Sequence, residues 1–201
     1  MAVPHKEGFT LIETMVAISI LTLAIAGPMF TASRSIVAAQ TARDQLIATY
    51  LAQEGIEHVR AMRDNAYLFA YHIGGTNVSS AAWSTFLSRT GTFSISGCIA
   101  PEKCTLDPAG SGSLERCTTT DGSCPPLHLT GCTYGPGGLT CTPPNIYTQQ
   151  ALSGSVLSPF TRTIQGIAVS PGEEKIVSTV SWSFHGTPYS VTISDHLTSW
   201  H

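Results

Sequence analysis

Six cysteines form the densest group of reactive side chains in the sequence, and all lie between residues 98 and 141: Cys98, Cys104, Cys117, Cys124, Cys132 and Cys141. Thiolates at such positions either bind a metal or oxidise to disulfides. Structural metal sites normally use close Cys-x-x-Cys pairs, and the six cysteines contain none. If the domain is exported from the cytoplasm, the even number of cysteines favours three disulfides. Two disulfides with free thiols, and a metal site, are the alternatives.

The connectivity of three disulfides is not determined by the sequence, because six cysteines allow fifteen pairings. Bridges between neighbouring cysteines would close short loops. Each would stabilise the fold by roughly 2–3 kcal/mol if the chain-entropy account holds.

Catalytic motifs are absent from the sequence. It contains no Gly-x-Ser-x-Gly elbow, no P-loop and no His-Glu-x-x-His helix, and its 7 histidines are dispersed. We therefore expect no enzymatic activity, no metal and no cofactor. The formal net charge of −3, with the few basic residues of the C-terminal part scattered along it, also gives no indication of nucleic-acid binding.

Glu13 is the single acid next to a long apolar run. Residues 14–33 carry no charge, and Phe9 to Ile12 extend the run towards the N-terminus. About 20 apolar residues cross a bilayer as a helix, whereas a secretory signal peptide has a shorter apolar core followed by a cleavage site. We therefore expect residues 9–33 to form a transmembrane helix. An ionised carboxylate there costs at least ~2.5–3.5 kcal/mol, so Glu13 should be protonated or paired with a cation.

Gly27 and Pro28 interrupt this apolar segment. Proline removes a backbone donor and clashes with the carbonyl four residues earlier. The pair therefore predicts a helix break, either as a static kink or as a place where the helix unwinds.

The helix is expected to continue through residues 34–64. Apolar residues recur there at helical spacing, at Ile36, Ile47, Leu51, Ile56, Val59 and Met62. Asp64-Asn65 is a plausible end. A helix from Phe9 to Arg63 would be roughly 80 Å long at 1.5 Å per residue, so its second part should pack its apolar face on a globular head.

Residues 65–201 are expected to form that head, which is rich in Ser, Thr, Gly and Pro. We expect a short strand at residues 93–95, an irregular Cys-rich loop at 98–141 and an antiparallel sheet at 160–194. In residues 176–184 the apolar side chains alternate with polar ones, Ser178 excepted, and a turn at 185–188 leads into a second alternating run. The fold class is α+β, a long helix packed on a small antiparallel sheet.

The N-terminal junction identifies a family resemblance. The sequence Lys6-Glu7-Gly8-Phe9-Thr10-Leu11-Ile12-Glu13 resembles the prepilin signal of type IV pilins and type II secretion pseudopilins. The resemblance implies that residues 1–8 are a leader, that a prepilin peptidase cuts between Gly8 and Phe9, and that Phe9 becomes N-methylated. It also implies that Glu13 pairs with the N-terminal amine of a neighbouring subunit, with Thr10 beside it as a helper.

Further features are similar to minor pilins. Leu51-Ala52-Gln53-Glu54 is one of them, and a Trp-bearing hairpin followed by Leu197 and Trp200 is another. The resemblance implies a minor pilin in a single-pass arrangement in the bacterial inner membrane, with an extracytoplasmic head, that later enters a pilus or periplasmic filament. Its implied partners are the prepilin peptidase, other pilin or pseudopilin subunits, an inner-membrane assembly platform and membrane lipid. A tip or adhesin-like binding subunit and a secretion pseudopilin are the alternatives.

Overall fold

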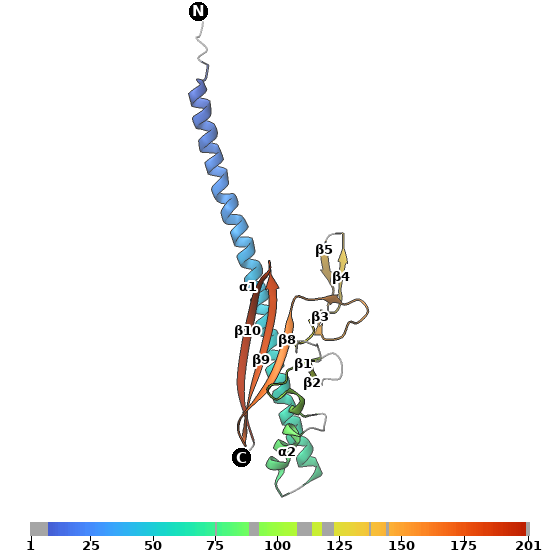
Figure 1. Cartoon of the computed structure of the whole chain (residues 1–201). Helices are drawn as coiled ribbons and strands as arrows, with labels where there is room; N and C mark the ends of the chain where they lie inside the picture. The colour runs from blue at the N-terminus through green and yellow to red at the C-terminus, as the bar shows by residue number, and fades with distance from the viewer. Residues whose placement is uncertain are drawn as a thin grey trace, which may run out of the picture. The chain divides into compact units, whose positions relative to one another are not determined.

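The structure is a computed structural model that divides into two compact units, residues 1–44 and residues 45–201. Helix α1 (Leu11–Ile73) contributes residues to both units (Figure 1). The described parts of the chain are residues 8–74, 76–88, 93–107, 114–117, 123–136, 138–143 and 145–199.

The first unit contains the N-terminal part of α1, which is continuous through Gly27 and Pro28, so the single chain does not unwind at the predicted break; a static kink there, or unwinding within a filament, stays a prediction. Both residues lie inside α1. A proline removes only one N–H from the backbone ladder, and the turns on either side keep their own bonds. The Thr31 hydroxyl also donates to the Pro28 carbonyl at 2.9 Å, which gives a backbone oxygen of this turn an additional partner.

The second part of α1 differs from the prediction at both ends. The compact second unit begins at Gln45, because the buried face of the helix begins at Ala48, while Ile36 is exposed. The helix also continues nine residues beyond Asp64 and ends at Ile73. The expected stop fails because Ala66 extends the buried face by one more turn, four residues after Met62.

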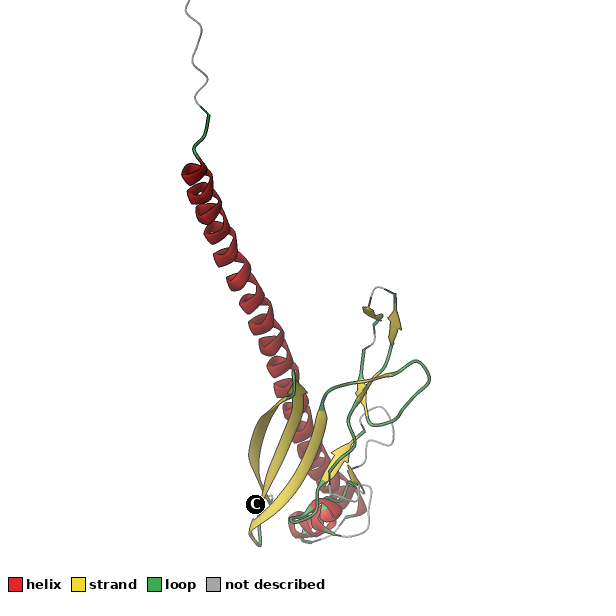
Figure 2. Ribbon diagram, turned by 45° about the horizontal axis from the view of Figure 1, so that its top comes forward, coloured by secondary structure: helices red, strands yellow, loops and turns green. Residues whose placement is uncertain are grey.

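The second unit is built on a five-stranded antiparallel sheet in the order β10-β9-β8-β1-β2. Its strands are β1 (Cys104–Leu106), β2 (Leu114–Arg116), β8 (Thr161–Ser170), β9 (Glu173–Phe184) and β10 (Thr187–Thr198). The three long strands lie side by side along the second part of α1 (Figures 1 and 2). The predicted α+β fold is confirmed.

The hairpin of β9 and β10 is confirmed, with a tighter turn than predicted. Phe184 pairs with Thr187, so only His185 and Gly186 form the loop. Their φ values are 51° and 79°, as a two-residue type I′ turn requires, and the glycine adopts this region without strain. In β9 the predicted inward face is buried from Ile176 to Trp182, and the polar Ser178 lies on that face.

The remaining elements of the second unit are short. Residues 93–95, predicted as a strand, instead lead into a 3₁₀ turn, and the Ile95 N–H donates to the Phe86 carbonyl at 2.9 Å. These three residues have no neighbouring run of alternating apolar and polar residues with which a strand could pair. The short elements are α2 (Val78–Leu87), the 3₁₀ turn η1 (Ser96–Cys98), β3 (His128–Leu129), β4 (Cys132–Gly135), β5 (Gly138–Cys141), β6 (Tyr147–Thr148) and β7 (Val156–Leu157).

All six cysteines form disulfides between sequence neighbours: Cys98–Cys104, Cys117–Cys124 and Cys132–Cys141. The prediction of three bridges is confirmed. The first bridge joins η1 to β1, and the third joins directly opposed residues of the β4–β5 hairpin. These crosslinks brace a region whose strands are at most four residues long.

Close approach of α1 to the sheet explains the polar residue on the inward face of β9. A Cβ atom built on Gly55 would lie 2.6 Å from the Ser178 hydroxyl oxygen and 3.3 Å from the Ile164 side chain. Only a small residue fits on each side of this contact, so glycine lies on the helix and serine on the strand.

We predict that Gly55→Ala destabilises the protein by about 1–3 kcal/mol, because overpacking outweighs the better helix propensity of alanine. The same change in a Ser178→Ala background should cost less than half as much, since the clashing oxygen is gone. A double-mutant cycle by thermal unfolding of the detergent-solubilised chain measures this. Equal costs in both backgrounds would disprove the contact.

Glu174 is a buried acid on β9 that forms no ion pair with any described residue. It lies in register with Ala168 of β8 and Leu197 of β10, and its Oε1 accepts no hydrogen bond from the described residues. Burial raises the pKa of Glu174 above its ordinary value of 4.5. The folded protein therefore binds this proton more tightly than the unfolded chain does.

The raised pKa predicts a pH-dependent stability. The contribution of Glu174 is fully present below the unfolded pKa and is lost as pH rises through the folded pKa. Glu174→Gln should therefore flatten the decline of Tm between pH 4 and pH 8, and raise stability at pH 7 by on the order of 1 kcal/mol. Glu115→Gln, on the exposed strand β2, is the control and should leave the profile unchanged. Identical profiles for wild type and Glu174→Gln would contradict this.

Candidate functional site

The junction between Gly8 and Phe9 lies just before α1, which begins two residues later at Leu11. Gly8, Phe9 and Thr10 have no regular secondary structure and are exposed. No heavy atom lies within 4 Å of the position that a Gly8 Cβ would take. Within the described residues, this peptide bond is therefore open to a protease.

Thr10 caps the helix. The Glu13 N–H donates to the Thr10 carbonyl at 3.1 Å and to its hydroxyl at 3.4 Å, and the Thr14 N–H donates to the same carbonyl at 3.2 Å. Thr10 thus occupies the N-cap position and Glu13 the third helical position, and the Thr10 hydroxyl accepts from the otherwise unpaired Glu13 N–H. The Thr-x-x-Glu spacing in the sequence indicates this helix cap, which the apolar run alone does not predict.

Glu13 therefore has two physical roles in this geometry. As the acid of the first turn it lies at the positive end of the helix dipole. It also lies four residues, about one helical turn, from Phe9, whose amine would be free after cleavage.

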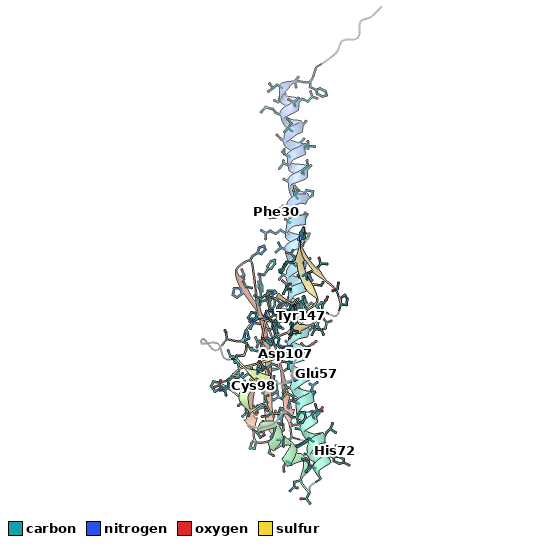
Figure 3. All side chains as sticks on the ribbon, turned by 90° about the vertical axis from the view of Figure 1, so that its right-hand side faces the viewer. Phe30, Glu57, His72, Cys98, Asp107 and Tyr147 are labelled. Atoms are coloured by element: carbon teal, nitrogen blue, oxygen red, sulfur yellow. A yellow bond between two sulfur atoms is a disulfide. The ribbon has the colours of Figure 1, made fainter. Side chains whose placement is uncertain are left out.

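The apolar side chains of the first unit are unpartnered within the described chain. α1 contains an 18-residue window with mean hydropathy 1.9, none of which is buried, and it is long and apolar enough to cross a membrane. Phe9 is 84% exposed, and Figure 3 shows side chains projecting from this part of the helix on all sides. A surface of this kind needs lipid or other apolar helices around it.

A buried polar network holds the second unit together. Arg162 of β8 is fully buried, and its guanidinium donates to the Glu54 carboxylate of α1, to the Leu51 carbonyl at 3.2 Å and to the Leu106 carbonyl at 2.8 Å. Burial lowers the pKa of Arg162 below its ordinary value. The carboxylates of Glu54 and Asp107 oppose this shift but do not cancel it. One side chain thus ties the helix to strand β1 and to its own strand.

Asp107 completes this network from the end of β1. It is buried and accepts a hydrogen bond from the Thr148 hydroxyl at 2.7 Å. Thr148 belongs to β6 of the three-stranded sheet β6-β3-β7, so the network also connects this small sheet to the end of β1. Its residues form a structural brace, since the buried Arg162 guanidinium faces the carboxylates of Glu54 and Asp107 and donates to two backbone carbonyls.

The remaining predicted site residues are placed as follows. Gly8, Phe9, Thr10 and Glu13 lie together at the start of α1, whereas Gly27 and Pro28 lie more than three helical turns away. The cysteines all belong to the second unit. Trp200 lies outside the described residues.

Comparison with known proteins identifies the N-terminal segment. Residues 4–27 match the family model described as the prokaryotic N-terminal methylation motif. No curated protein and no solved structure matches the chain.

The chain thus carries the type IV pilin and pseudopilin signature at its N-terminus. This motif supports a type IV pilin-like or pseudopilin protein, and the exposed apolar helix fits it. The motif is that of a structural subunit and not of an enzyme. It implies processing by a prepilin peptidase and assembly with other pilin subunits, and the apolar helix fits membrane anchoring.

Proposed function

We propose that the protein is a minor pilin, a structural subunit of a type IV pilus or related filament. A prepilin peptidase cuts it after Gly8, and Phe9 becomes N-methylated. The mature chain stays in the bacterial inner membrane through residues 9–33, with residues 34–64 and the head at 65–201 on the extracytoplasmic side. The observation that carries this proposal is the methylation motif at residues 4–27 at the start of a helix whose 18-residue apolar window is not buried at all.

Assembly follows from the needs of the apolar helix. Membrane lipid covers it before assembly, and the helices of neighbouring subunits replace the lipid in the filament. In such a bundle an unpaired carboxylate is costly, so Glu13 pairs with the cationic amine of a neighbouring Phe9. The pair fixes the axial register of the subunits, and Thr10 holds the first turn in place. An inner-membrane platform supplies the mechanical work.

The disulfides support an extracytoplasmic head. Three bridges form and persist in an oxidising compartment such as the periplasm and are rare in the cytoplasm. No cofactor is needed for this function.

A second candidate is a tip or adhesin-like binding subunit, and a specific observation favours it. The β4–β5 hairpin is braced by Cys132–Cys141 and exposes the opposed pair Tyr134 and Leu139, which are 73% and 46% accessible. A third candidate is a pseudopilin of a type II secretion system, which the same N-terminal motif fits.

Immunogold labelling with an antibody against the head distinguishes these roles. Sparse labelling along sheared surface filaments supports a minor pilin, and labelling confined to filament ends supports a tip subunit. Labelling confined to the periplasm, together with a loss of protein secretion when the gene is deleted, supports a pseudopilin. Absence from every filament and membrane fraction would rule out all three roles.

A further inference from the structure

Strand β10 forms a free edge of the five-stranded sheet. It pairs with β9 and, in the strand order β10-β9-β8-β1-β2, with no other strand of the described chain (Figure 1). Its register with β9 runs without a shift over all 12 residues of β10, whereas the pairing of β8 with β9 contains a shift. The other edge strand, β2, has 3 residues. β10 is therefore the long unpaired edge of this sheet.

The turn of the hairpin decides which backbone groups of β10 face outward. In a two-residue turn the flanking residues, here Phe184 and Thr187, form a hydrogen-bonded pair, and such pairs recur at every second residue. The N–H and C=O groups that bond to β9 therefore belong to odd-numbered residues, Tyr189, Val191 and Ile193. The even-numbered residues direct these groups away from the sheet, and their side chains are exposed: Ser190, Thr192 and Ser194.

The middle of this edge lacks the features by which proteins usually block edge pairing. Such features are charged side chains, proline and bulges. Pro188 and Asp195 lie at the two ends, whereas residues 189–194 between them contain no charge, no proline and no register shift. We call residues 189–194 the β10 edge. Its outward backbone groups are open to another strand.

The charged residues paired with β10 lie beyond the β10 edge. Residues 177–184 of β9, which lie opposite residues 187–194, carry no charge. The charged residues that pair with β10, in register or by an ion pair, lie opposite residues 195–198: Arg60 of α1, which bonds to Asp195 at 2.8 Å, and Glu173, Glu174 and Lys175 of β9. The β10 edge is therefore locally uncharged and favours a strand that is uncharged as well.

One face of the β10 edge carries an apolar row that the protein covers only in part. Val191 and Ile193 are half-buried and pack against the core cluster that contains Val180 and Trp182. Tyr189 stacks on Trp182, with ring centroids 5.7 Å apart, and stays 37% exposed. In a sheet, such a row is covered further when a neighbouring strand places apolar side chains beside it. The row therefore fits a strand whose apolar residues alternate with polar ones.

We propose that the β10 edge binds an extended strand of a different protein, in which apolar residues alternate with uncharged polar ones over the length of residues 189–194. Strand addition of this kind takes its affinity from main-chain hydrogen bonds and its specificity from alternate side chains. The incoming strand bonds to Ser190, Thr192 and Ser194 and covers the apolar row. That the partner is a different protein rests on the proposed function, since a sparse subunit rarely lies beside another copy of itself.

Photocrosslinking in the host tests whether the partner lies there as a strand. Benzoylphenylalanine replaces Ser190 or Ser194, one at a time, in the full-length chain, and mass spectrometry maps the attachment. Both probes should attach to one segment of the same protein, at points about four residues, or roughly 13 Å, apart. The same probe at Ser170, exposed at the end of β8, should not attach to that segment. Attachment to a second copy of this chain, scattered attachment, attachment of both probes at one point, or no crosslink would overturn the proposal.

A proline variant tests the backbone bonds separately. Thr192→Pro removes an outward N–H that the pairing with β9 does not use, and an edge strand tolerates proline at such a position. It should lower the crosslink yield from Ser190 by about tenfold or more. Thr192→Val is the matched control. Both variants lose the bond between the Thr192 and Thr179 hydroxyls, which is 3.0 Å long, but valine keeps the N–H and should leave the yield unchanged.

A charge on the apolar row supplies a readout that does not depend on proline. Val191→Lys places an ammonium group where the incoming strand would bury it, and should also lower the yield by about tenfold or more. Ser170→Lys, at the exposed end of β8, should leave the yield unchanged. Thermal unfolding of the detergent-solubilised chain identifies a variant that fails to fold, and the other variant then decides. Wild-type yield in a folded Thr192→Pro or Val191→Lys chain would overturn the proposal.

The processing state separates this inference from the proposed function. If the chain is cut after Gly8 and enters filaments, but the spaced attachments from Ser190 and Ser194 are absent, only the strand assignment fails. If the wild-type chain is not cut after Gly8, the proposed function itself fails, whatever the crosslinks show.

Discussion

A Glu13→Ala variant should be cut after Gly8 and remain in the membrane, yet enter filaments at least about tenfold less than wild type. The reason is that its Phe9 amine, charged and seated among apolar helices, would lose the carboxylate partner of a neighbouring subunit. A buried charge that loses its partner destabilises an interface by about 3–5 kcal/mol, more than enough for this loss. Quantitative blots of sheared filaments against the membrane fraction measure it.

The capping role of Glu13 calls for a matched control. Glutamine at the same position keeps the backbone N–H that donates to the Thr10 hydroxyl and has a similar side-chain shape, but it carries no charge. Glu13→Gln should therefore fail in incorporation like Glu13→Ala if charge pairing is the function. Wild-type incorporation of Glu13→Gln would show that Glu13 acts only as a helix cap. Thr14→Ala, which removes only a local hydroxyl bond to Leu11, should incorporate normally.

Replacement of Arg162 should have the largest effect on stability. In Arg162→Met the carbonyls of Leu51 and Leu106 lose their donor, and the buried acid Asp107 loses its cation. Removing one partner from a buried ionic network typically costs about 3–5 kcal/mol, a large part of the roughly 5–15 kcal/mol that stabilises a domain. Tm should fall by roughly 10 °C or more, as measured by circular dichroism of the full chain in detergent.

A surface ion pair provides the comparison for Arg162. Arg116 lies 3.6 Å from Glu102, and its side chain is half exposed. Arg116→Met should therefore change stability by less than about 1 kcal/mol. Equal effects of the two substitutions would contradict the bracing role of Arg162. The loss of stability in Arg162→Lys should lie between those of Arg162→Met and Arg116→Met, because lysine keeps the charge but cannot donate to three acceptors in the same planar arrangement.

The parts of the fold with a strong local pattern could be predicted from the sequence. The apolar run after Glu13 and the alternation in residues 176–184 are both local, and each gave the correct element. Three disulfides followed from the cysteine count, while their pairing did not, because it depends on which loop ends meet in space.

Long-range contacts could not be predicted from the sequence. Arg162 and Glu54 are 108 residues apart and meet only because β8 packs on α1. Strands β1 and β2, of three residues each, have no pattern of their own and exist through pairing with the sheet. Gly55 resembled an ordinary weak helix residue, and its importance depends on Ser178 lying opposite it. Pro28 lies inside the continuous helix α1, so one missing donor does not unwind this helix in the single chain.

Intact-mass and N-terminal analysis of the protein from its host tests the central claim most directly. The account predicts a mature chain of 193 residues (201 − 8) that starts at N-methylated Phe9 and retains three disulfides. A chain that retains Met1, or one that is cut after the apolar segment at residues 14–33, would contradict it.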